Sequence, residues 1–318
     1  MTRPTRIFFA TDIHASNRCF KKFLNAAKHY EADVLVLGGD VTGKAFVPVV
    51  MKTAGSGTAV DNGKELELET ATEISRFEER ASDAGSYVFR CCPEEYRRLL
   101  VDGAARDELF NKLIEERIRA WVSLADERLH DRGIRVFFNA GNDDHFSIDP
   151  LIDASTTMVR PEDRCVEVDD YCTMISTGFA NVTPFHCPRD VLETELTRKI
   201  ENMVSDVADL GRCIFNFHCP PFQSNLDNAP KLDGDLRPQM TGLGIEFAPV
   251  GSTAVRTAIE RHQPLLGLHG HIHESKGIAY IGRTLCLNPG SEYHEGILRG
   301  ALIQLQRGAV QHYMLTSG

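Results

Sequence analysis

The stretch from Arg6 to Asp40 decides the fold, and it reads RIFFATDIHASNRCFKKFLNAAKHYEADVLVLGGD. Its first six residues are mostly apolar and predict a buried strand that ends at Asp12. Residues 16–30 then predict a helix, because apolar side chains recur at helical spacing, at Phe20, Phe23, Leu24 and Ala27. Residues 33–37 predict a second buried strand, which Gly38-Gly39-Asp40 ends. Strand, helix and strand with short connections form a βαβ unit, so the two strands are expected to be parallel.

The same alternation returns in the second half of the chain. Helices are expected over residues 189–210 and 252–262, and strands over 134–139, 165–168, 172–177, 213–217 and 264–268. Residues 223–244 are rich in Asn, Asp, Gly and Pro and predict a long mobile loop. Four closing strands are expected at 278–281, 284–287, 300–306 and 310–315. The pattern indicates an α/β fold.

Residues 44–105 interrupt this alternation. Their pattern predicts strands over 44–53 and 64–70 joined by a turn over 54–63, a helix over 72–84 capped by Thr72, and a strand over 87–92. Pro93 then opens a helical stretch. We expect these residues to form a small α+β cap inserted into a single domain that spans residues 1–318. The pattern leaves open whether the cap roofs a site on the core or lies to its side.

Composition restricts the function classes. Of 318 residues, 42% are hydrophobic, 35 are Lys or Arg and 45 are Asp or Glu, giving a formal net charge of −10. This balance argues against nucleic acid as a partner, because a phosphate-binding face needs clustered cations. No apolar run approaches the roughly 20 residues that span a bilayer. The apolar run near the N-terminus is also too short for a signal peptide, and the 9 cysteines form no CxxC pair. We therefore expect a cytoplasmic protein with reduced cysteines and no membrane anchor; the oligomeric state stays open.

Short polar motifs follow five of the predicted strands. They are Asp12-Ile13-His14, Gly39-Asp40, Gly141-Asn142-Asp143, His218 and Gly270-His271-Ile272-His273. Ligand sites in α/β sheets assemble at the carboxyl ends of strands. Carboxylate, amide and imidazole groups are ligands for divalent transition metals. Each motif alone is weak, but their ordered combination predicts a metal site.

In this order the motifs resemble those of the calcineurin-like metallophosphoesterases, whose pattern is DxH, GD, GN followed by His, Asp or Glu, a lone His, and GHxH. The resemblance covers residues 6 to about 290. The stretch Asn288-Pro289-Gly290-Ser291 also looks like small bacterial and archaeal members that act on phosphodiesters. The resemblance implies a four-layer αββα sandwich of two mixed sheets.

It also implies a dinuclear centre. Its ligands would be Asp12, His14 and His273 for one ion, Asn142, His218 and His271 for the other, and Asp40 bridging both. The implied cofactors are two divalent metal ions, with manganese expected and iron, zinc, cobalt or nickel as alternatives. Two such ions can hold a phosphoryl group and acidify a bridging water, and the resulting hydroxide attacks phosphorus. The implied substrate is a small phosphoester.

One departure from the family pattern concerns the catalytic acid. Most phosphomonoesterases of the family have His directly after the Asn, whereas this chain has Asp143 there and His145 two residues later. An ionised carboxylate cannot donate a proton and repels phosphate oxygens. We therefore expect a phosphodiesterase acting on a small or nucleotide-like substrate, with Asp143 and His145 as further catalytic candidates beside Asp40 and Asn142.

Two other functions stay open. One is a phosphomonoesterase or protein phosphatase with His145 as the acid, and the other is a non-catalytic, metal-bound adaptor. Arg18 and Arg189 are candidate phosphate contacts, because a guanidinium matches phosphate oxygens.

Overall fold

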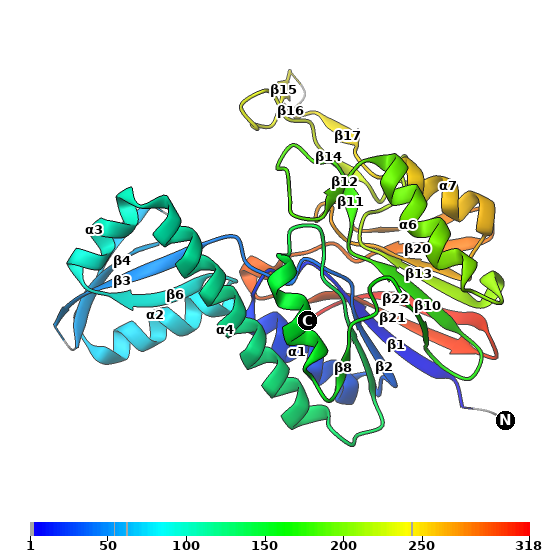
Figure 1. Cartoon of the computed structure of the whole chain (residues 1–318), viewed down its shortest axis with the longest axis horizontal. Helices are drawn as coiled ribbons and strands as arrows, with labels where there is room; N and C mark the ends of the chain where they lie inside the picture. The colour runs from blue at the N-terminus through cyan, green and yellow to red at the C-terminus, as the bar shows by residue number, and fades with distance from the viewer. Residues whose placement is uncertain (1–2, 54, 62, 243) are drawn as a thin grey trace.

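The chain folds around two six-stranded mixed sheets (Figure 1). The computed structural model describes residues 3–53, 55–61, 63–242 and 244–318. The first sheet has the order β22-β21-β1-β2-β7-β8. Its strands are β1 (Thr5–Ala10), β2 (Val34–Leu37), β7 (Arg135–Phe138), β8 (Met158–Val159), β21 (Arg299–Gln306) and β22 (Ala309–Ser317). β1, β2, β7 and β8 are parallel, as the opening βαβ unit predicts, and β21 is antiparallel to β1.

The second sheet has the order β19-β20-β18-β13-β10-β9. Its strands are β9 (Cys165–Glu167), β10 (Thr173–Thr177), β13 (Cys213–Phe217), β18 (Leu266–Leu268), β19 (Gly277–Ile281) and β20 (Thr284–Asn288). The inner four strands are parallel, and the two edge strands are antiparallel to their neighbours.

The two sheets pack face to face with helices outside. Ile7 and Phe9 of β1 belong to the core between the sheets, whereas Phe8 and Ala10 face the helices on the other side. A strand buried on both faces needs such a continuous apolar run. The first sheet is covered by α1 (Asn17–His29), α4 (Gly103–Leu129) and α5 (Asp149–Asp153), and the second by α6 (Glu193–Ser205) and α7 (Thr253–His262). The expected four-layer αββα sandwich is confirmed.

A lobe projects from one side of the sandwich (Figure 1). Its sheet, in the order β5-β4-β3-β6, is made of β3 (Phe46–Thr53), β4 (Ser56–Asp61), β5 (Lys64–Leu68) and β6 (Tyr87–Cys91). The helices α2 (Ala71–Asp83) and α3 (Pro93–Val101) complete it. The lobe has its own small core of Val49, Ala59, Leu68, Ile74 and Phe77. α4 joins lobe and sandwich, because Phe110 contacts the rings of Phe46 and Tyr87 while Trp121 packs in the sandwich.

A narrow arm extends from another side of the molecule (Figure 1). It consists of two short antiparallel ladders, β14 (Asn228–Pro230) with β17 (Phe247–Pro249), and β15 (Met240–Thr241) with β16 (Gly244–Ile245). A further pair, β11 (Ala180–Asn181) with β12 (Asp190–Val191), lies before α6. The 3₁₀ helices in the described part of the chain are η1 (Phe146–Ile148), η2 (Leu210–Arg212) and η3 (Tyr293–Glu295).

Several sequence expectations are wrong in detail. Strand β4 occupies much of the stretch expected as a turn over 54–63, whose residues 54 and 62 lie outside the described part. Helix α2 begins at Ala71, because Thr70 and Glu73 form a capping box in place of the expected cap at Thr72. The helix expected over 189–210 spans only Glu193–Ser205. The expected loop over 223–244, of which residue 243 is not described, contains β14, β15 and the first residue of β16.

Candidate metal centre

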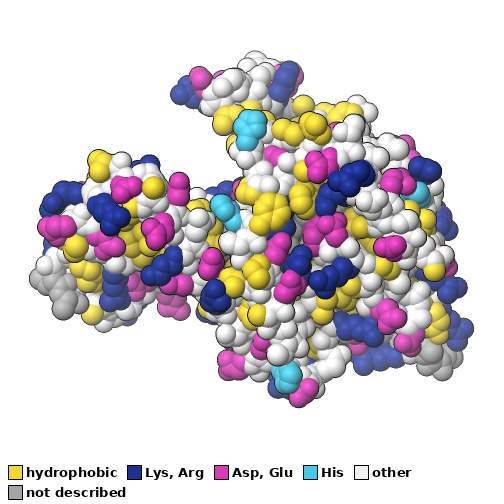
Figure 2. All heavy atoms as spheres, viewed as in Figure 1, with side chains coloured by type: hydrophobic (Ala, Val, Ile, Leu, Met, Phe, Trp, Pro, Cys, Tyr) yellow, Lys and Arg dark blue, Asp and Glu magenta, His cyan; other side chains and the backbone are white. Residues whose placement is uncertain are grey.

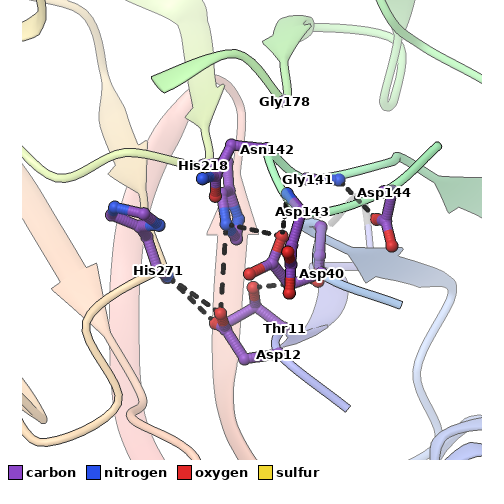
Figure 3. A network of polar contacts seen from close by, with 12 residues as sticks. Thr11, Asp12, Asp40, Gly141, Asn142, Asp143, Asp144, Gly178, His218 and His271 are labelled. Carbon is purple, nitrogen blue, oxygen red and sulfur yellow. Dashed lines mark hydrogen bonds and ion pairs between the residues drawn. The ribbon is translucent and has the colours of Figure 1, made fainter. Parts of the chain in front are cut away.

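The predicted ligands gather where five parallel strands end. Asp12 and His14 follow β1, Asp40 follows β2, Asn142 follows β7, His218 follows β13, and His271 and His273 follow β18. Figure 3 shows Asp12, Asp40, Asn142 and His218 converging from these loops. Both sheets therefore contribute to one cluster. All of these residues are buried except His271 and His273, which are half-buried.

The backbone is strained at four of these residues. Asp12, His14, Asp40 and His271 have φ values of 53°, 36°, 48° and 67°. Left-handed backbone at residues other than glycine concentrates at functional sites. Hydrogen bonds between the loops hold this geometry, from the Asp12 N–H to the Gly39 carbonyl (2.9 Å) and from the His14 N–H to the Asp40 carbonyl (3.1 Å).

The side chains form three groups that can each hold a metal ion. They are Asp12 with His14 and His273, Asp40 with His218 and His271, and His14 with Asp40 and Asp143. Within each group the donor atoms lie within 4.8 Å of one another. His14 Nε2 lies 3.1 Å from His273 Nε2, and His218 Nε2 lies 3.3 Å from Asp40 Oδ1. The first two groups match the two ligand sets that the sequence predicts, except that Asp40 belongs only to the second group and Asn142 to neither.

Asn142 is oriented by a carboxylate that the motif pattern does not contain. Its Nδ2 donates to Asp190 Oδ1 at 2.9 Å. The other oxygen of Asp190 accepts from the backbone of Thr183 and Cys187 and from the Thr183 hydroxyl. Asn142 Oδ1 is buried and has no hydrogen-bond partner among the described residues. Because a buried polar oxygen without a partner is costly, this atom fits a metal ligand.

Two histidines of the cluster are oriented by backbone carbonyls. The Nδ1 atoms of His14 and His218 lie 3.0 and 3.2 Å from the backbone carbonyls of Thr42 and Gly38. A carbonyl that accepts the Nδ1 proton leaves Nε2 free to bind a metal. His218 Nε2 is itself buried without a hydrogen-bond partner among the residues that the structure describes.

Burial and the charges of neighbouring side chains shift the pKa values of the cluster in opposite directions. Burial lowers the pKa of His14 and of His271 to about 4, so both imidazoles are neutral at pH 7. Burial acts against ionisation of Asp12, but the hydrogen bond from His273 and the charges of His218 and His273 lower its pKa to about 2. Against the effect of burial, Asp40 and Asp12 raise the pKa of His218 to about 9. A metal ion at this position therefore has to displace a proton.

The two candidates for the catalytic acid lie differently. Asp143 belongs to the third group, and its Oδ2 lies 3.0 Å from Lys44 Nζ. His145 is half-buried at the start of η1, where its carbonyl accepts from Arg189. A role for either side chain in proton transfer stays a prediction.

The two arginines suggested as phosphate contacts both pair with carboxylates of the fold. Arg189 is 1% exposed, pairs with Asp149 and lies 4.4 Å above the Phe146 ring. Arg18 pairs with Asp83 of the lobe at 3.0 Å. Arg189 is therefore committed to the fold, whereas a phosphate contact by Arg18, whose side chain is 50% exposed, stays a prediction.

Three residues around the cluster were missed by sequence reasoning. Asp144 is buried and accepts from the backbone of Val41, Thr42 and Gly141, so it ties two of the ligand loops together. Burial, and then the charge of Asp40, raise its pKa to about 6. Asp190 and Lys44 are the other two. Of these three residues, only Asp144 could have been found from the sequence, because it lies within the motif Gly141-Asn142-Asp143-Asp144.

Within the described part of the chain, every helix is too short or too polar to cross a membrane.

No family model matches the chain. The uncharacterized protein MJ1162 of Methanocaldococcus jannaschii is 30% identical over 141 residues, which cover 44% of this chain and 57% of that protein. The chain thus spans little more than half the length of this relative.

Solved structures share the fold over almost the whole chain. One covers 98% of this chain and 98% of its own, with a TM-score of 0.56 and 17% identity. The protein TT1561 of Thermus thermophilus covers 99% and 98%, with a TM-score of 0.53 and 14% identity. An archaeal phosphodiesterase aligns over 99% of this chain and 100% of its own, with a TM-score of only 0.37 and 11% identity. The first two likenesses establish a common fold.

Proposed function

We propose that this chain is a metal-dependent phosphoester hydrolase of the calcineurin-like metallophosphoesterase type. The observation that carries the proposal is that Asp40 lies between the two sets of ligands, with Oδ2 3.8 Å from His14 Nε2 and Oδ1 3.3 Å from His218 Nε2. Asn142 Oδ1 is buried in the same region without a partner among the described residues. Buried carboxylates, imidazole nitrogens and an amide oxygen suit two divalent transition metals, with manganese as the expected ion. A cytoplasmic location stays a prediction.

In this proposal Asp12, His14 and His273 hold one ion. Asn142, His218 and His271 hold the other, and Asp40 contacts both. When bound, two such ions act as Lewis acids toward the phosphoryl oxygens and lower the pKa of water. The chain's own part is to fix the ligands: carbonyls orient His14 and His218, and Asp190 orients Asn142.

The proposed substrate class is a phosphodiester of a small or nucleotide-like molecule. Asp143 supports this choice, because it occupies the position where a monoesterase has its histidine and lies within 4.8 Å of donor atoms of His14 and Asp40. Without a proton donor at that position, substrates with good leaving groups are favoured.

The test uses purified protein stripped by a chelator and reloaded separately with manganese, nickel, cobalt or zinc. We expect no activity without metal, and faster turnover of aryl phosphodiesters than of alkyl phosphomonoesters after reloading. A metal-loaded protein that hydrolyses neither would overturn the proposal and favour an adaptor.

The variant His145→Ala decides the role of that histidine. A large loss of kcat confined to poor leaving groups would make His145 the acid and favour a monoesterase. An equal and small effect on every substrate would leave His145 as part of the loop.

A further inference from the structure

Lys44 brings a positive charge to the edge of the candidate metal centre. It lies just after the Asp40 loop, where the chain leaves the sandwich for the lobe. Its Nζ is 3.0 Å from Asp143 Oδ2, and Asp143 in turn adjoins the cluster, since its donor atom lies within 4.8 Å of those of His14 and Asp40. The ammonium is therefore one carboxylate away from the proposed metals.

Stability does not account for this ion pair. The Lys44 side chain is 55% exposed and that of Asp143 is 24% exposed. Exposed ion pairs contribute little to folding. The same exposure leaves the ammonium accessible to a ligand that enters the cluster.

The neighbouring groups keep Lys44 charged and directed toward the cluster. Burial works against its charge, but Asp143 and Asp40 raise its pKa above the ordinary value. Asp143 is held in turn, because its backbone N–H donates to Asp40 Oδ1 at 3.1 Å and the Cys187 thiol lies 3.5 Å from its Oδ1. Asp143 thus fixes the position of the lysine rather than facing the substrate alone.

We infer that Lys44 is a substrate-binding residue that contacts a non-bridging oxygen of the phosphoryl group, with Asp143 as its positioning residue. This inference rests on the proposed function. It also explains how phosphate can bind near Asp143, because the Lys44 ammonium offsets the negative charge of the Asp143 carboxylate that would otherwise repel phosphate. A lysine ammonium is a compact charge that suits a single phosphate oxygen.

The test measures binding of inorganic phosphate to the manganese-loaded protein by calorimetry, together with kcat and KM for an aryl phosphodiester. We expect Lys44→Met to weaken phosphate binding by about ten- to a hundredfold and to raise KM, because a charge-assisted hydrogen bond is lost. Metal content should be unchanged. Lys52→Met is the matched control, because Lys52 lies on the same lobe, pairs with Glu67 and is 53% exposed. It should leave all of these values unchanged.

The double variant Lys44→Met/Asp143→Asn separates two roles of the lysine. If Lys44 contacts phosphate, removing the Asp143 charge does not restore phosphate affinity. If affinity returns to the wild-type value, the lysine only neutralises Asp143 and the inference is wrong. Wild-type affinity in Lys44→Met alone would also overturn it.

Failure of the proposed function looks different. In that case the metal-loaded wild type hydrolyses no phosphoester, whereas phosphate binding still reports on Lys44.

Discussion

At the scale of single residues, the candidate centre depends on side chains outside the proposed ligand set. Asp190 holds the Asn142 amide so that its oxygen, not its nitrogen, faces the cluster. We predict that Asp190→Asn weakens metal affinity by about 10- to 100-fold, as is typical for partners of metal ligands. Metal titration of the stripped protein checks this. Asp153→Asn, which changes a surface carboxylate paired with Arg160, should have no effect. Equal affinities for both variants and the wild type would contradict the role of Asp190.

Asp40 should be the most sensitive of the proposed ligands. Its two carboxylate oxygens face ligands of both proposed ions, because Oδ2 lies 3.8 Å from His14 Nε2 and Oδ1 lies 3.3 Å from His218 Nε2. We predict that Asp40→Asn loses both ions and all activity, and that Asp12→Asn retains one ion. Metal analysis after gel filtration distinguishes the two results. Full metal content and activity in Asp40→Asn would show that another residue bridges the ions.

The sequence could predict those residues of the centre that belong to short motifs after strands, but not those that tertiary packing brings to it. Asp12, His14, His271 and His273 form motifs directly after apolar strands, so the strand pattern places them at one edge. Asp190 and Lys44 have no such spacing. The apolar pattern places Asp190 in a helix, and only the pairing of β11 with β12 brings it to Asn142. Contacts of this kind depend on tertiary packing, which local patterns do not contain.

At the scale of elements, the lobe is attached directly to a ligand loop. The turn between α2 and β6 contacts the loop after β1: the Ser16 hydroxyl donates to the Asp83 carbonyl, and Arg117 donates to the carbonyls of Ala15 and Ser86. Gly85, with φ of 96°, packs so closely that a Cβ there would lie 2.3 Å from the His14 carbonyl oxygen. The position of His14 therefore depends on the lobe.

This contact gives a prediction for Gly85→Ala. We expect it to lower the free energy of unfolding by about 1–3 kcal/mol and to weaken metal binding, because His14 must move. Thermal unfolding and metal titration measure the two effects. Gly63→Ala is the control, because Gly63 is a lobe glycine with φ of 75° and open space around it. The Gly63→Ala variant should lose stability without losing metal affinity. An equal loss of metal affinity in both variants would show that the contact between Gly85 and His14 is not the cause.

Glu162 joins the two sheets beneath the centre. It is buried and accepts from Asn139 after β7 and from Thr177 and Gly178 at the end of β10. Burial, and then the charge of Asp163, raise its pKa above 4.5. The folded state therefore holds this proton at pH values where the unfolded chain has lost it. The resulting stabilisation is fully present below about pH 4.5 and is lost as the pH rises through the folded pKa.

We predict that Glu162→Gln flattens this dependence, because glutamine does not titrate. Urea unfolding of both metal-free proteins between about pH 4 and 8 measures the difference in free energy. The wild type should lose stability relative to the variant by about 1.4 kcal/mol for each pH unit between the two pKa values. A constant difference across this range would show that Glu162 ionises as in the unfolded chain.

The elements that sequence analysis found are those with a strong apolar period. The inner strands of both sheets and helices α1 and α7 lie close to their predicted ranges, and Ser16 and Ser252 cap the two helices. Strand β4 was missed because Ser56-Gly57-Thr58 contains turn-forming residues, and only pairing with β3 and β5 makes it a strand. The arm was missed because its ladders contain only two or three residues per strand, too few to show an alternating apolar pattern.

At the scale of the whole molecule, the centre lies in a sandwich flanked by two projections. Figure 2 shows the lobe standing apart on the left and the arm above, with a hollow between them. In this arrangement the lobe extends beside the sandwich while its root contacts the His14 loop. The lobe therefore has three possible roles. The sequence leaves open a roof over the metals and a surface for packing or dimerisation, and the contact with the His14 loop adds support of a ligand loop.

Deleting only part of the lobe, for example residues 46–70 with β3, β4 and β5, would not separate these roles. That segment contains β3, the strand that pairs with β6, and β6 carries the Tyr87 hydroxyl that accepts from the Gly43 N–H. A replacement of residues 46–101 by a short linker removes the lobe as a unit. It ends before Asp102, which caps α4, and it keeps the part of α4 that packs on the sandwich, at Ile114, Ile118, Trp121, Ala125 and Leu129.

We predict that this replacement folds but loses affinity for the ion held by Asp12, His14 and His273, because Asp83, Gly85 and Ser86 no longer support the loop after β1. The group of Asp40, His218 and His271 should keep its ion, because the hydrogen bond between the Asp40 loop and the lobe, from the Gly43 N–H to the Tyr87 hydroxyl, lies three residues beyond Asp40. Circular dichroism, metal analysis and kcat/KM for small and bulky aryl diesters check the three roles together. Retention of both ions with faster turnover of bulky diesters would make the lobe a roof. Retention of both ions with unchanged selectivity would leave packing or dimerisation, because neither access to the centre nor support of His14 would then depend on the lobe.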